Sequence, residues 1–532
     1  MCDFRKTIKL LSVAAAAILM VSCGNKGEKA TSATKGNMIP DNAVIAMKVD
    51  ADQLWNKALG DEGSDMRNYW NMGKSMLSMS AGELGEIGDV VRKVLKDPAA
   101  LGVCMEEPVV VSVAADIVDV YNEEVDVEVC LVALLDDSGA FVNVVDAVMD
   151  VANEEGELGM SKEVVSDSYT YYSAVIDEGV SLDLGVSAES AVLRIKADMT
   201  SKNQNLKTSM LGLFAEGGPE RTEGIDAFYA SKSDLAMWMD FEGVIEMARP
   251  VLESEEPAVI AQLDEYMPMY EGASMVSDLT FKDGQTVLQI SMFGSEQMKA
   301  YSAKYNAVSS DKYFDYLPAT SALVVNVALK DFAGLVSEMC KSNKELADGF
   351  EYLEEELGID DELLAGFPGV ITFALDGQGL GDRQIPGMVL LMDCEENVWE
   401  FIETYLEMYA EEVKPDEYNL MDMFYIAYAD GTLSAASDME VSIASFGDTI
   451  LSRQLEKGGM IFDLASLPPH ILNDFAQEID GSISGEELLE YLSSVVLTNT
   501  PDHMTATLTL NMDDKEHNLL EKVLLYAVNS AF

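Results

Sequence analysis

The sequence predicts an α+β protein made of two tandem related halves, each a largely antiparallel sheet with covering helices. Short apolar or alternating stretches recur along the whole chain, which is typical of strands. Many of these stretches come in pairs separated by Gly- or Asp-containing turns, as in antiparallel hairpins. The order of strands and helices in the first half also recurs in the second, which indicates an internal repeat.

The composition excludes two broad classes of protein. The 532 residues include 34 Lys+Arg and 94 Asp+Glu, giving a formal net charge of −60. Hydrophobic residues make up 48% of the chain, too many for a disordered acidic protein. The cations are too few and too scattered for a protein that binds nucleic acid by neutralising phosphates. The length is ample for sizeable cores.

Residues 1–22 have the organisation of a lipoprotein signal peptide. Three cations precede an apolar run, Leu10 to Val21, that is too short to span a bilayer comfortably. The run ends in Met20-Val21-Ser22-Cys23, which resembles a bacterial lipobox, with Met20 where Leu is usual. We expect cleavage just before Cys23, whose sulfur would carry the lipid. The alternative is an ordinary signal peptide with an incidental cysteine.

Residues 23–38 predict a flexible tether after the lipidated cysteine, because they are polar and rich in Gly, Ser, Thr and Lys. Gly24 replaces the Asp that would suggest retention in the inner membrane, so the outer membrane is favoured. The tether lacks the acidic run that resembles a surface-export tag. We therefore expect the protein to face the periplasm.

The first half is expected over residues 39–308. Ile39 and Pro40 open a polar turn that leads into an apolar strand and the start of a helix, over residues 44–54. This half also carries two additions, a Met-rich helical stretch at 61–96 and a Gly-interrupted stretch at 203–224.

The second half is expected over residues 315–532. Leu317 and Pro318 open a similar turn, followed by a strand and a helix start over 322–332. Further strand and helix predictions match in the same order in both halves. The matched pairs are 108–116 and 125–137 with 369–377 and 386–396; the helices 138–153 and 396–412; 171–185 and 424–437; 191–197 and 440–445; 235–244 and 459–467; 279–293 and 497–511; and the closing helices 295–307 and 513–529.

Four cysteines remain outside the signal region. They are Cys104, Cys130, Cys340 and Cys394. Their spacing does not choose among the three possible pairings, and buried free thiols explain them equally well. Because no CxxC occurs, neither a zinc ribbon nor a thioredoxin-like redox site is predicted.

Histidine-based catalysis has little support. The three histidines, His470, His503 and His517, all lie near the end of the chain, and neither a GxSxG elbow nor an HExxH motif is present. Carboxylate-only chemistry, as in glycosidases, is compatible with so many acids, but no local pattern singles out a pair. We expect no cofactor and, on balance, no enzyme.

A weak calcium-binding candidate lies near residue 480. Glu478, Asp480 and Glu487 have the spacing of the later ligands of an EF-hand loop, with Glu487 in the bidentate position. The first ligand position falls on Ala476, which has no oxygen to offer. The competing interpretation is a turn followed by a helix, in which Ser484 and Glu487 form a capping box.

Thr449 is a possible O-glycosylation site. It lies in Asp448-Thr449-Ile450, an Asp-Ser/Thr-apolar triplet that resembles acceptor sites of exported proteins in Bacteroidetes. A triplet of this kind also occurs easily by chance.

Methionines recur at near-helical spacing in the stretch 61–96. They are Met66, Met72, Met76 and Met79. Such a stripe usually fills gaps in a core, but the flexible thioether side chain also suits adaptable binding surfaces.

The lipobox-like start, the polar tether and the Ile39-Pro40-Asp41-x-Ala43 opening resemble the domain-of-unknown-function 4836 family of Bacteroidetes-type lipoproteins. The resemblance implies an envelope lipoprotein and supplies no catalytic residues. Together with the residues above, it leads us to expect a non-catalytic binding or scaffolding module. Its membrane contact would be the lipid on Cys23, and its partner a protein or a glycan. The alternative is a carboxylate-based hydrolase acting on envelope or extracellular glycans.

Overall fold

The computed structural model describes residues 39–531, apart from several internal segments. These are 41, 82–84, 120–123, 155–158, 167–168, 178–179, 198–221, 256–259, 261–263, 265–266, 343, 379, 382–385, 438–444, 480, 482 and 501–503. None of the helices in the described residues is long and apolar enough to cross a membrane.

The predicted fold class is wrong in its central feature. The described strands belong to a single antiparallel sheet of twenty strands, and not to two separate sheets in tandem halves. Local sequence patterns cannot reveal this, because they show where strands occur but not which strand edges pair. The chain divides into two compact units, residues 1–281 with 520–532 and residues 282–519. The predicted half boundaries at 308 and 315 stay a prediction.

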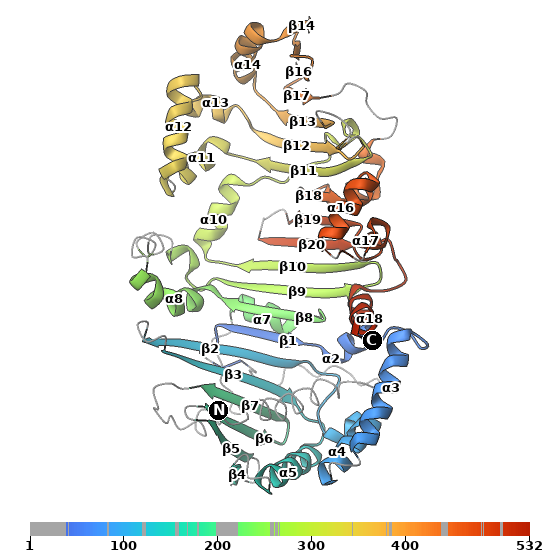
Figure 1. The fold of residues 1–532 in the computed structure, drawn as a ribbon. Helices are drawn as coiled ribbons and strands as arrows, with labels where there is room; N and C mark the ends of the chain where they lie inside the picture. Colours follow the sequence, from blue (N-terminus) through green and yellow to red (C-terminus); the bar gives the residue numbers. More distant parts are fainter. Residues whose placement is uncertain are drawn as a thin grey trace. The chain divides into compact units, whose positions relative to one another are not determined.

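Unit 1 is built around β1 (Ile45–Val49), which pairs with both β2 and β8. Its strand order is β4-β5-β6-β7-β3-β2-β1-β8-β9 (Figure 1). The other strands are β2 (Val109–Asp119), β3 (Glu124–Leu134), β4 (Ser161–Ser166), β5 (Tyr169–Asp177), β6 (Val180–Ser187), β7 (Ser190–Ala197), β8 (Leu235–Asp240) and β9 (Ser274–Lys282).

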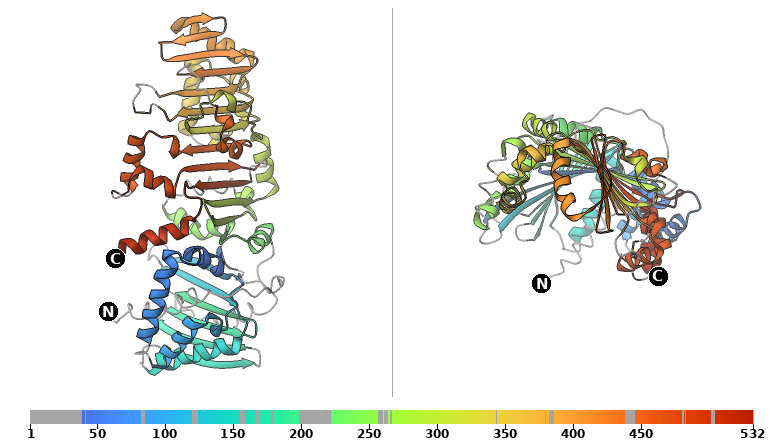
Figure 2. Two further views of the ribbon diagram at one scale, coloured as in Figure 1. Left: turned by 90° about the vertical axis from the view of Figure 1, so that its right-hand side faces the viewer. Right: turned by 90° about the horizontal axis from the view of Figure 1, so that it is seen from above.

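The helices of unit 1 follow its strands. They are α2 (Ala51–Leu59), α3 (Asp65–Ser80), α4 (Gly85–Lys96), η2 (Pro98–Leu101), α5 (Ser138–Glu154), α7 (Glu223–Ala230), α8 (Phe241–Glu255) and α18 (Leu519–Ala531). Asp50 and Ser64 cap α2 and α3 by accepting hydrogen bonds from the amides of Gln53 and Arg67. Figure 2 shows α3, in blue, along one margin of this unit.

Unit 2 is built around β11 (Ser321–Leu329), which pairs with β12 and β18. Its strand order is β14-β15-β16-β17-β13-β12-β11-β18-β19-β20-β10. The other strands are β10 (Gln285–Phe293), β12 (Gly369–Asp376), β13 (Met388–Asp393), β14 (Glu411–Lys414), β15 (Glu417–Leu420), β16 (Phe424–Ala429), β17 (Thr432–Ala436), β18 (Gly459–Asp463), β19 (Ser494–Asn499) and β20 (Thr505–Asn511).

The helices of unit 2 lie between these strands along the chain. They are α10 (Glu296–Tyr305), η3 (Phe314–Tyr316), α11 (Phe332–Ser342), α12 (Lys344–Leu357), α13 (Asp361–Ala365), α14 (Glu396–Tyr409), η4 (Phe446–Asp448), α15 (Ile450–Leu455), η5 (Leu464–Ser466), α16 (Pro469–Ile479) and α17 (Gly485–Tyr491).

The order of strand pairings in β1–β9 recurs in β11–β19. In each series the first strand pairs with the second and the eighth, and the third pairs with the seventh. The fourth to seventh strands then follow as successive hairpins. Rows of residues across the two sheet regions can therefore be compared position by position.

The main cores lie between strands and helices. In unit 1, Phe141 of α5 packs with Tyr172 of β5 and Leu184 of β6. In unit 2, Phe314 and Phe446 pack edge to face at 5.3 Å between ring centroids and cover β11. Burial of these apolar side chains is the main stabilising term for each unit.

Most of the strand and helix predictions are confirmed at the level of the element. The strand–helix openings at 44–54 and 322–332 are β1 with α2 and β11 with α11. The helix predicted over 396–412 is too long, because α14 ends at Tyr409 and the edge strand β14 begins at Glu411. The strand predicted over 440–445 falls largely outside the described residues, as does most of the stretch 203–224.

Candidate functional site

A row of polar side chains crosses the middle of the unit 1 sheet. The register places Ser112 of β2 opposite Cys130 of β3, Cys130 opposite Arg194 of β7, and Arg194 opposite Asp183 of β6. Directly opposed residues point to the same side of a sheet, so these four side chains share one face. Arg194 is only 6% exposed and Asp183 only 3% exposed. Polar groups buried this deeply require partners within the protein.

The charged members of this row make their contacts with one another. Glu128, two residues before Cys130 on the same face of β3, forms an ion pair with Arg194. Tyr171 of β5 donates its hydroxyl proton to Asp183 Oδ1. Asp183 Oδ2 is buried and has no hydrogen-bond partner among the described residues. We call Glu128, Tyr171, Asp183 and Arg194 the buried charge cluster.

Burial dominates the electrostatics of this region. It raises the pKa of Asp183, while the hydrogen bond from Tyr171 and the charge of Arg194 act in the opposite direction. Burial also raises the pKa of the Cys130 thiol to about 12. That thiol is therefore protonated at neutral pH, and it is neither a ready nucleophile nor a thiolate ligand for a metal.

The corresponding row of unit 2 shows that the strand arrangement does not require these charges. There Val324 of β11 lies opposite Ala374, Ala374 opposite Val389, and Val389 opposite Ala436. An apolar row avoids the desolvation cost of buried ions, which can exceed their mutual attraction. The buried charge cluster is therefore a special feature of unit 1. Chemically it offers two carboxylates held beside one guanidinium.

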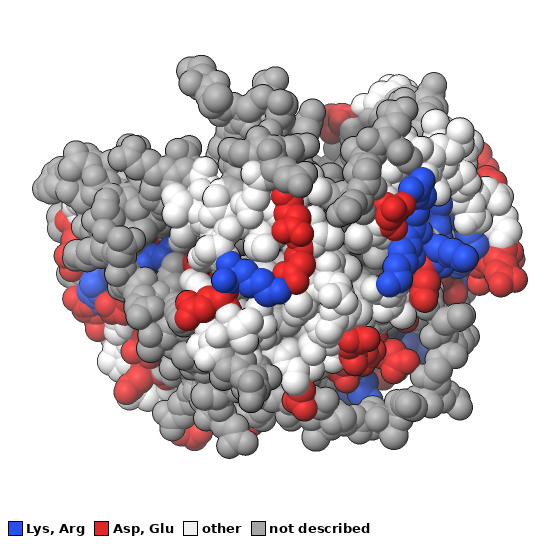
Figure 3. Space-filling model, turned by 90° about the horizontal axis from the view of Figure 1, so that it is seen from below, with Lys and Arg blue, Asp and Glu red and all other residues white. Residues whose placement is uncertain are grey.

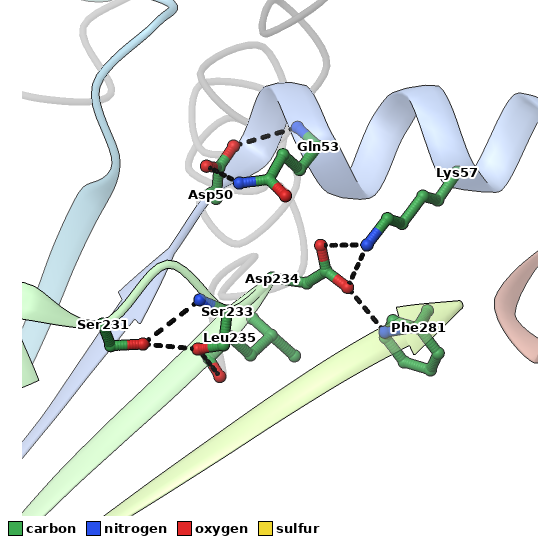
Figure 4. A network of polar contacts seen from close by, with 8 residues as sticks. All are labelled: Asp50, Gln53, Lys57, Ser231, Ser233, Asp234, Leu235 and Phe281. Carbon is green, nitrogen blue, oxygen red and sulfur yellow. Dashed lines mark hydrogen bonds and ion pairs between the residues drawn. The ribbon is translucent and has the colours of Figure 1, made fainter. Parts of the chain in front are cut away.

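A second polar network joins α2 to the strands β8 and β9. Asp234, which is fully buried, accepts from Lys57 Nζ at 2.6 Å and 2.7 Å through its two carboxylate oxygens. Its Oδ2 also accepts from the Phe281 amide at 2.6 Å (Figure 4). Its own carbonyl accepts from the amide of Asp50, the capping residue of α2. Asp234 thus fixes the end of β1 and the start of β8 together.

Lys48 of β1 is a buried cation on the same side of unit 1 as helix α7. Its Nζ donates to the carbonyl oxygens of Phe228 at 2.8 Å, Tyr229 at 3.3 Å and Ser231 at 2.5 Å. These carbonyls belong to the end of α7, where the helix leaves acceptors unpaired and the helix dipole favours a cation. Burial lowers the pKa of Lys48, and the nearby charges of Asp278 and Asp50 partly oppose that shift.

Helix α3 carries an exposed apolar stripe. Met72 is 51% exposed, Met76 is 63% exposed and Met79 is 79% exposed. The spacing of these residues places them on one side of the helix. The opposite side faces the protein, where Met66 is buried and the rings of Trp70 and Trp55 meet at 4.4 Å between centroids. The predicted methionine stripe is therefore split between core and surface.

The surface carries acidic and basic groups side by side. Seen from below, basic side chains lie next to acidic ones with uncharged surface around them (Figure 3). In unit 1, Lys162 pairs with Asp146 at 2.6 Å, and Arg249 pairs with both Asp264 and Glu246. Exposed pairs of this kind contribute little to stability and mark no site by themselves.

The calcium candidate is only partly within the described residues. Glu478 lies in α16 and Glu487 in α17, whereas Asp480 falls outside the described residues. The predicted capping box is present: Ser484 Oγ accepts from the amide of Glu487, and a Glu487 carboxylate oxygen accepts from the amide of Ser484. The hydrogen bonds with Ser484 lower the pKa of Glu487. In the described residues, no group of three or more His, Cys, Asp or Glu side chains is arranged to hold a metal. The calcium hypothesis itself stays a prediction.

Thr449 caps α15. Its hydroxyl oxygen accepts from the amide of Ser452 at 3.2 Å and donates to the carbonyl of Phe446 at 2.7 Å. A glycan on this oxygen would replace the second of these hydrogen bonds. O-glycosylation of Thr449 stays a prediction.

The remaining predicted residues do not converge. Cys23 and His503 fall outside the described residues. His470 begins α16 next to Pro469, and His517 pairs with Asp514 at 2.9 Å on the surface. The four cysteines in the described part of the chain, Cys104, Cys130, Cys340 and Cys394, are all free, so the choice between thiols and disulfides falls to thiols.

Sequence reasoning missed both buried networks, although a signal was present. Lys48, Glu128, Asp183 and Arg194 are single charged residues inside otherwise apolar or alternating strands. A charge at an inward strand position requires a partner, so such a residue flags a buried polar contact. Its partner could not be read from the chain, since Lys48 bonds to a helix end 180 residues away.

A family comparison now places the chain. The model of the family described as "Domain of unknown function (DUF4836)" matches residues 35–425. The chain therefore belongs to this family, as its N-terminal resemblance implied. No curated protein matches the sequence.

Among solved structures, the chain is similar to the one titled "Structure of crystal form III of TP0453". The identity is 12% and the TM-score 0.25, over 52% of this chain and 90% of that chain. A likeness at this TM-score supports no conclusion about the present protein.

Proposed function

We propose that the protein is a lipid-anchored component of the cell envelope that acts as a non-catalytic binding or scaffolding module. The observation that carries the proposal is the N-terminal sequence, in which a basic and then apolar signal region ends in Ser22-Cys23. The lipid on Cys23 would hold the protein on the periplasmic face of the outer membrane. The polar residues 24–38 would separate the lipid from unit 1.

The role as a binding module is supported by how the described residues use their chemistry. Lys48, Asp234 and Arg194 have their charged groups committed to internal contacts. The exposed stripe on α3 instead presents flexible apolar side chains to the outside, which suits recognition of another surface. The partner would be a protein or another component of the envelope.

The anchor is tested by Cys23→Ala in the full chain expressed in its own type of host. We expect the substitution to abolish incorporation of a labelled fatty acid and to release the protein from the membrane fraction. Cys340→Ser is the matched control, because Cys340 is a free and partly exposed thiol of the folded body. Labelling that persists in Cys23→Ala would overturn the proposal.

The alternative of a glycan hydrolase would place its two carboxylates at Glu128 and Asp183. Both are less than one-tenth exposed and are held by Arg194 and Tyr171, so no described feature favours their access to a glycan. Release of reducing sugars from envelope glycans by the purified chain, lost in Glu128→Gln, would establish the hydrolase and displace the binding module.

A further inference from the structure

We infer that the exposed methionine stripe of α3, Met72, Met76 and Met79, lies on the bilayer surface that holds the acyl chains of Cys23. The inference deepens the proposed function and rests on its lipid anchor. It assigns the stripe one occupant, the lipid of the periplasmic leaflet. The argument uses the shape of the stripe, its charge and the reach of the tether.

The stripe is a continuous apolar surface that the fold leaves uncovered. Met72, Met76 and Met79 follow one another at i, i+4 and i+7, so they form one row along the outer side of α3. The inner side is already committed, through buried Met66 and through Tyr69, whose hydroxyl donates to Asn529 Oδ1 at 3.1 Å. A helix seated by one face and apolar on the other can rest on a membrane in the interfacial plane.

The polar groups beside the stripe bond within the helix itself. Ser75 Oγ donates to the carbonyl of Asn71 at 2.9 Å, and Ser80 Oγ donates to the carbonyl of Met76 at 3.1 Å. Their hydroxyl protons therefore need no water. This lowers the cost of bringing the outer side of α3 into the headgroup region.

The charge of α3 differs from that of the chain as a whole. From Met66 to Ala81 the sequence holds Arg67 and Lys74 and no Asp or Glu, in a chain whose formal net charge is −60. An acidic surface is repelled by anionic headgroups, whereas a helix with two cations is not. The same argument disfavours a second copy of this chain as the occupant, because two copies would each bring a large negative charge.

The tether brings the stripe within reach of the bilayer. The fifteen residues 24–38 join Cys23 to Ile39, and Ile39 and α3 belong to the same compact unit. A chain of this length extends to at most about 50 Å and has a root-mean-square span of roughly 20 Å. The acyl chains would therefore keep unit 1 at high local concentration near the leaflet, so a weak contact by α3 suffices.

The test measures lipid contact at single positions in the acylated full chain. The protein is reconstituted in vesicles of phosphatidylethanolamine and phosphatidylglycerol, with and without brominated acyl chains that quench tryptophan. Met76→Trp reports on the stripe. Val175→Trp is the matched control, because Val175 is 71% exposed in the same unit and lies on β5, away from α3. The signal of the wild-type tryptophans is subtracted from each.

We expect severalfold stronger bromolipid quenching of Met76→Trp than of Val175→Trp. A second readout uses native Trp70 on α3. The triple change Met72→Ser, Met76→Ser and Met79→Ser should weaken its quenching, and Val164→Ser with Val175→Ser should leave it unchanged. Circular dichroism confirms that each variant is folded.

The outcomes separate this inference from the anchor. Equal quenching at the two new tryptophans, in protein that still floats with the vesicles, would overturn the stripe contact and leave the anchor standing. Failure to float at all would overturn the proposed anchor. Concentration-dependent self-association that is lost in the triple serine variant, without bromolipid quenching, would assign the stripe to a second copy and also overturn the inference.

Discussion

The ammonium group of Lys48 donates to the carbonyl oxygen of Phe228 at 2.8 Å, across 180 residues of sequence. It thereby fastens the central strand β1 to the end of α7. The same position in unit 2 holds Asn326, which is fully buried and donates through Nδ2 to the carbonyl of Leu455 at 3.3 Å, at the end of α15. Each unit therefore uses one buried polar side chain of its central strand to hold the end of a short helix.

Lys48→Met should destabilise the protein. Methionine keeps the apolar stem but leaves the carbonyls of Phe228, Tyr229 and Ser231 without the donor they now share. Unpaired buried acceptors of this kind cost about 1–3 kcal/mol of unfolding free energy. Urea denaturation followed by circular dichroism measures the change. Lys330→Met is the control, because Lys330 makes a single bond, to Ala303, at the exposed surface.

The effect of Lys48 should depend on pH in a defined direction. Burial lowers its pKa below 10.5, so between the folded pKa and 10.5 the unfolded chain binds more protons than the folded one. Stability contributed by this group therefore rises as pH increases through that window. Wild-type stability should gain on Lys48→Met as pH rises toward 10.5. A constant difference between the two proteins would show that Lys48 does not titrate as the structure requires.

Asp183→Asn should reveal the opposite pH window. Burial raises the pKa of Asp183 above 3.8, so its ionised form is disfavoured in the folded state. The cost of ionisation is present in full above the folded pKa and disappears as pH falls toward 3.8. The wild type should therefore gain stability relative to Asp183→Asn as pH is lowered from 7. Thermal unfolding across this range measures the difference, and Asp448→Asn on an exposed turn is the control.

Asp393 in unit 2 should behave in the reverse sense. Burial acts to raise its pKa, but Lys312, the Val370 amide at 2.7 Å and the Tyr313 hydroxyl at 2.9 Å together lower it below 3.8. Its stabilising effect is thus present above 3.8 and is lost as pH falls through the folded pKa. Asp393→Asn should destabilise the protein at pH 7, and the difference from wild type should shrink in acid. A difference that persists unchanged at low pH would contradict the ionic contacts of Asp393.

Native thiol reactivity should rank the cysteines by burial. Burial raises the pKa of Cys130 to about 12 and of Cys104 and Cys394 to about 11, so little thiolate forms at pH 8. Cys340 is partly exposed and should react first with a thiol reagent. Mass spectrometry of alkylated peptides gives the order. Cys130 should be modified only after unfolding, and its early labelling would contradict the buried row of unit 1.

The sequence by itself determined the local elements of this protein. The alternation of apolar residues and the turns between them specify hairpins such as β16–β17, which closes through Asp430 and Gly431, both at positive φ. The Ser484 and Glu487 spacing specified a helix start. Pro415 and Asp416, the latter at φ 59, mark a turn that ends the strand β14, a signal that the overlong prediction for α14 did not use.

Only the tertiary structure decided which elements meet. The single twenty-stranded sheet depends on pairings between distant edges, and backbone hydrogen bonds that close a ladder carry no local sequence code. The partners of Lys48, Asp183 and Arg194 were likewise set by register across strands. The division of the methionines between core and surface depended on which face of α3 met Trp55 of α2. A charge or an apolar stripe in the sequence states a need for a partner, and the packing of the whole chain supplies it.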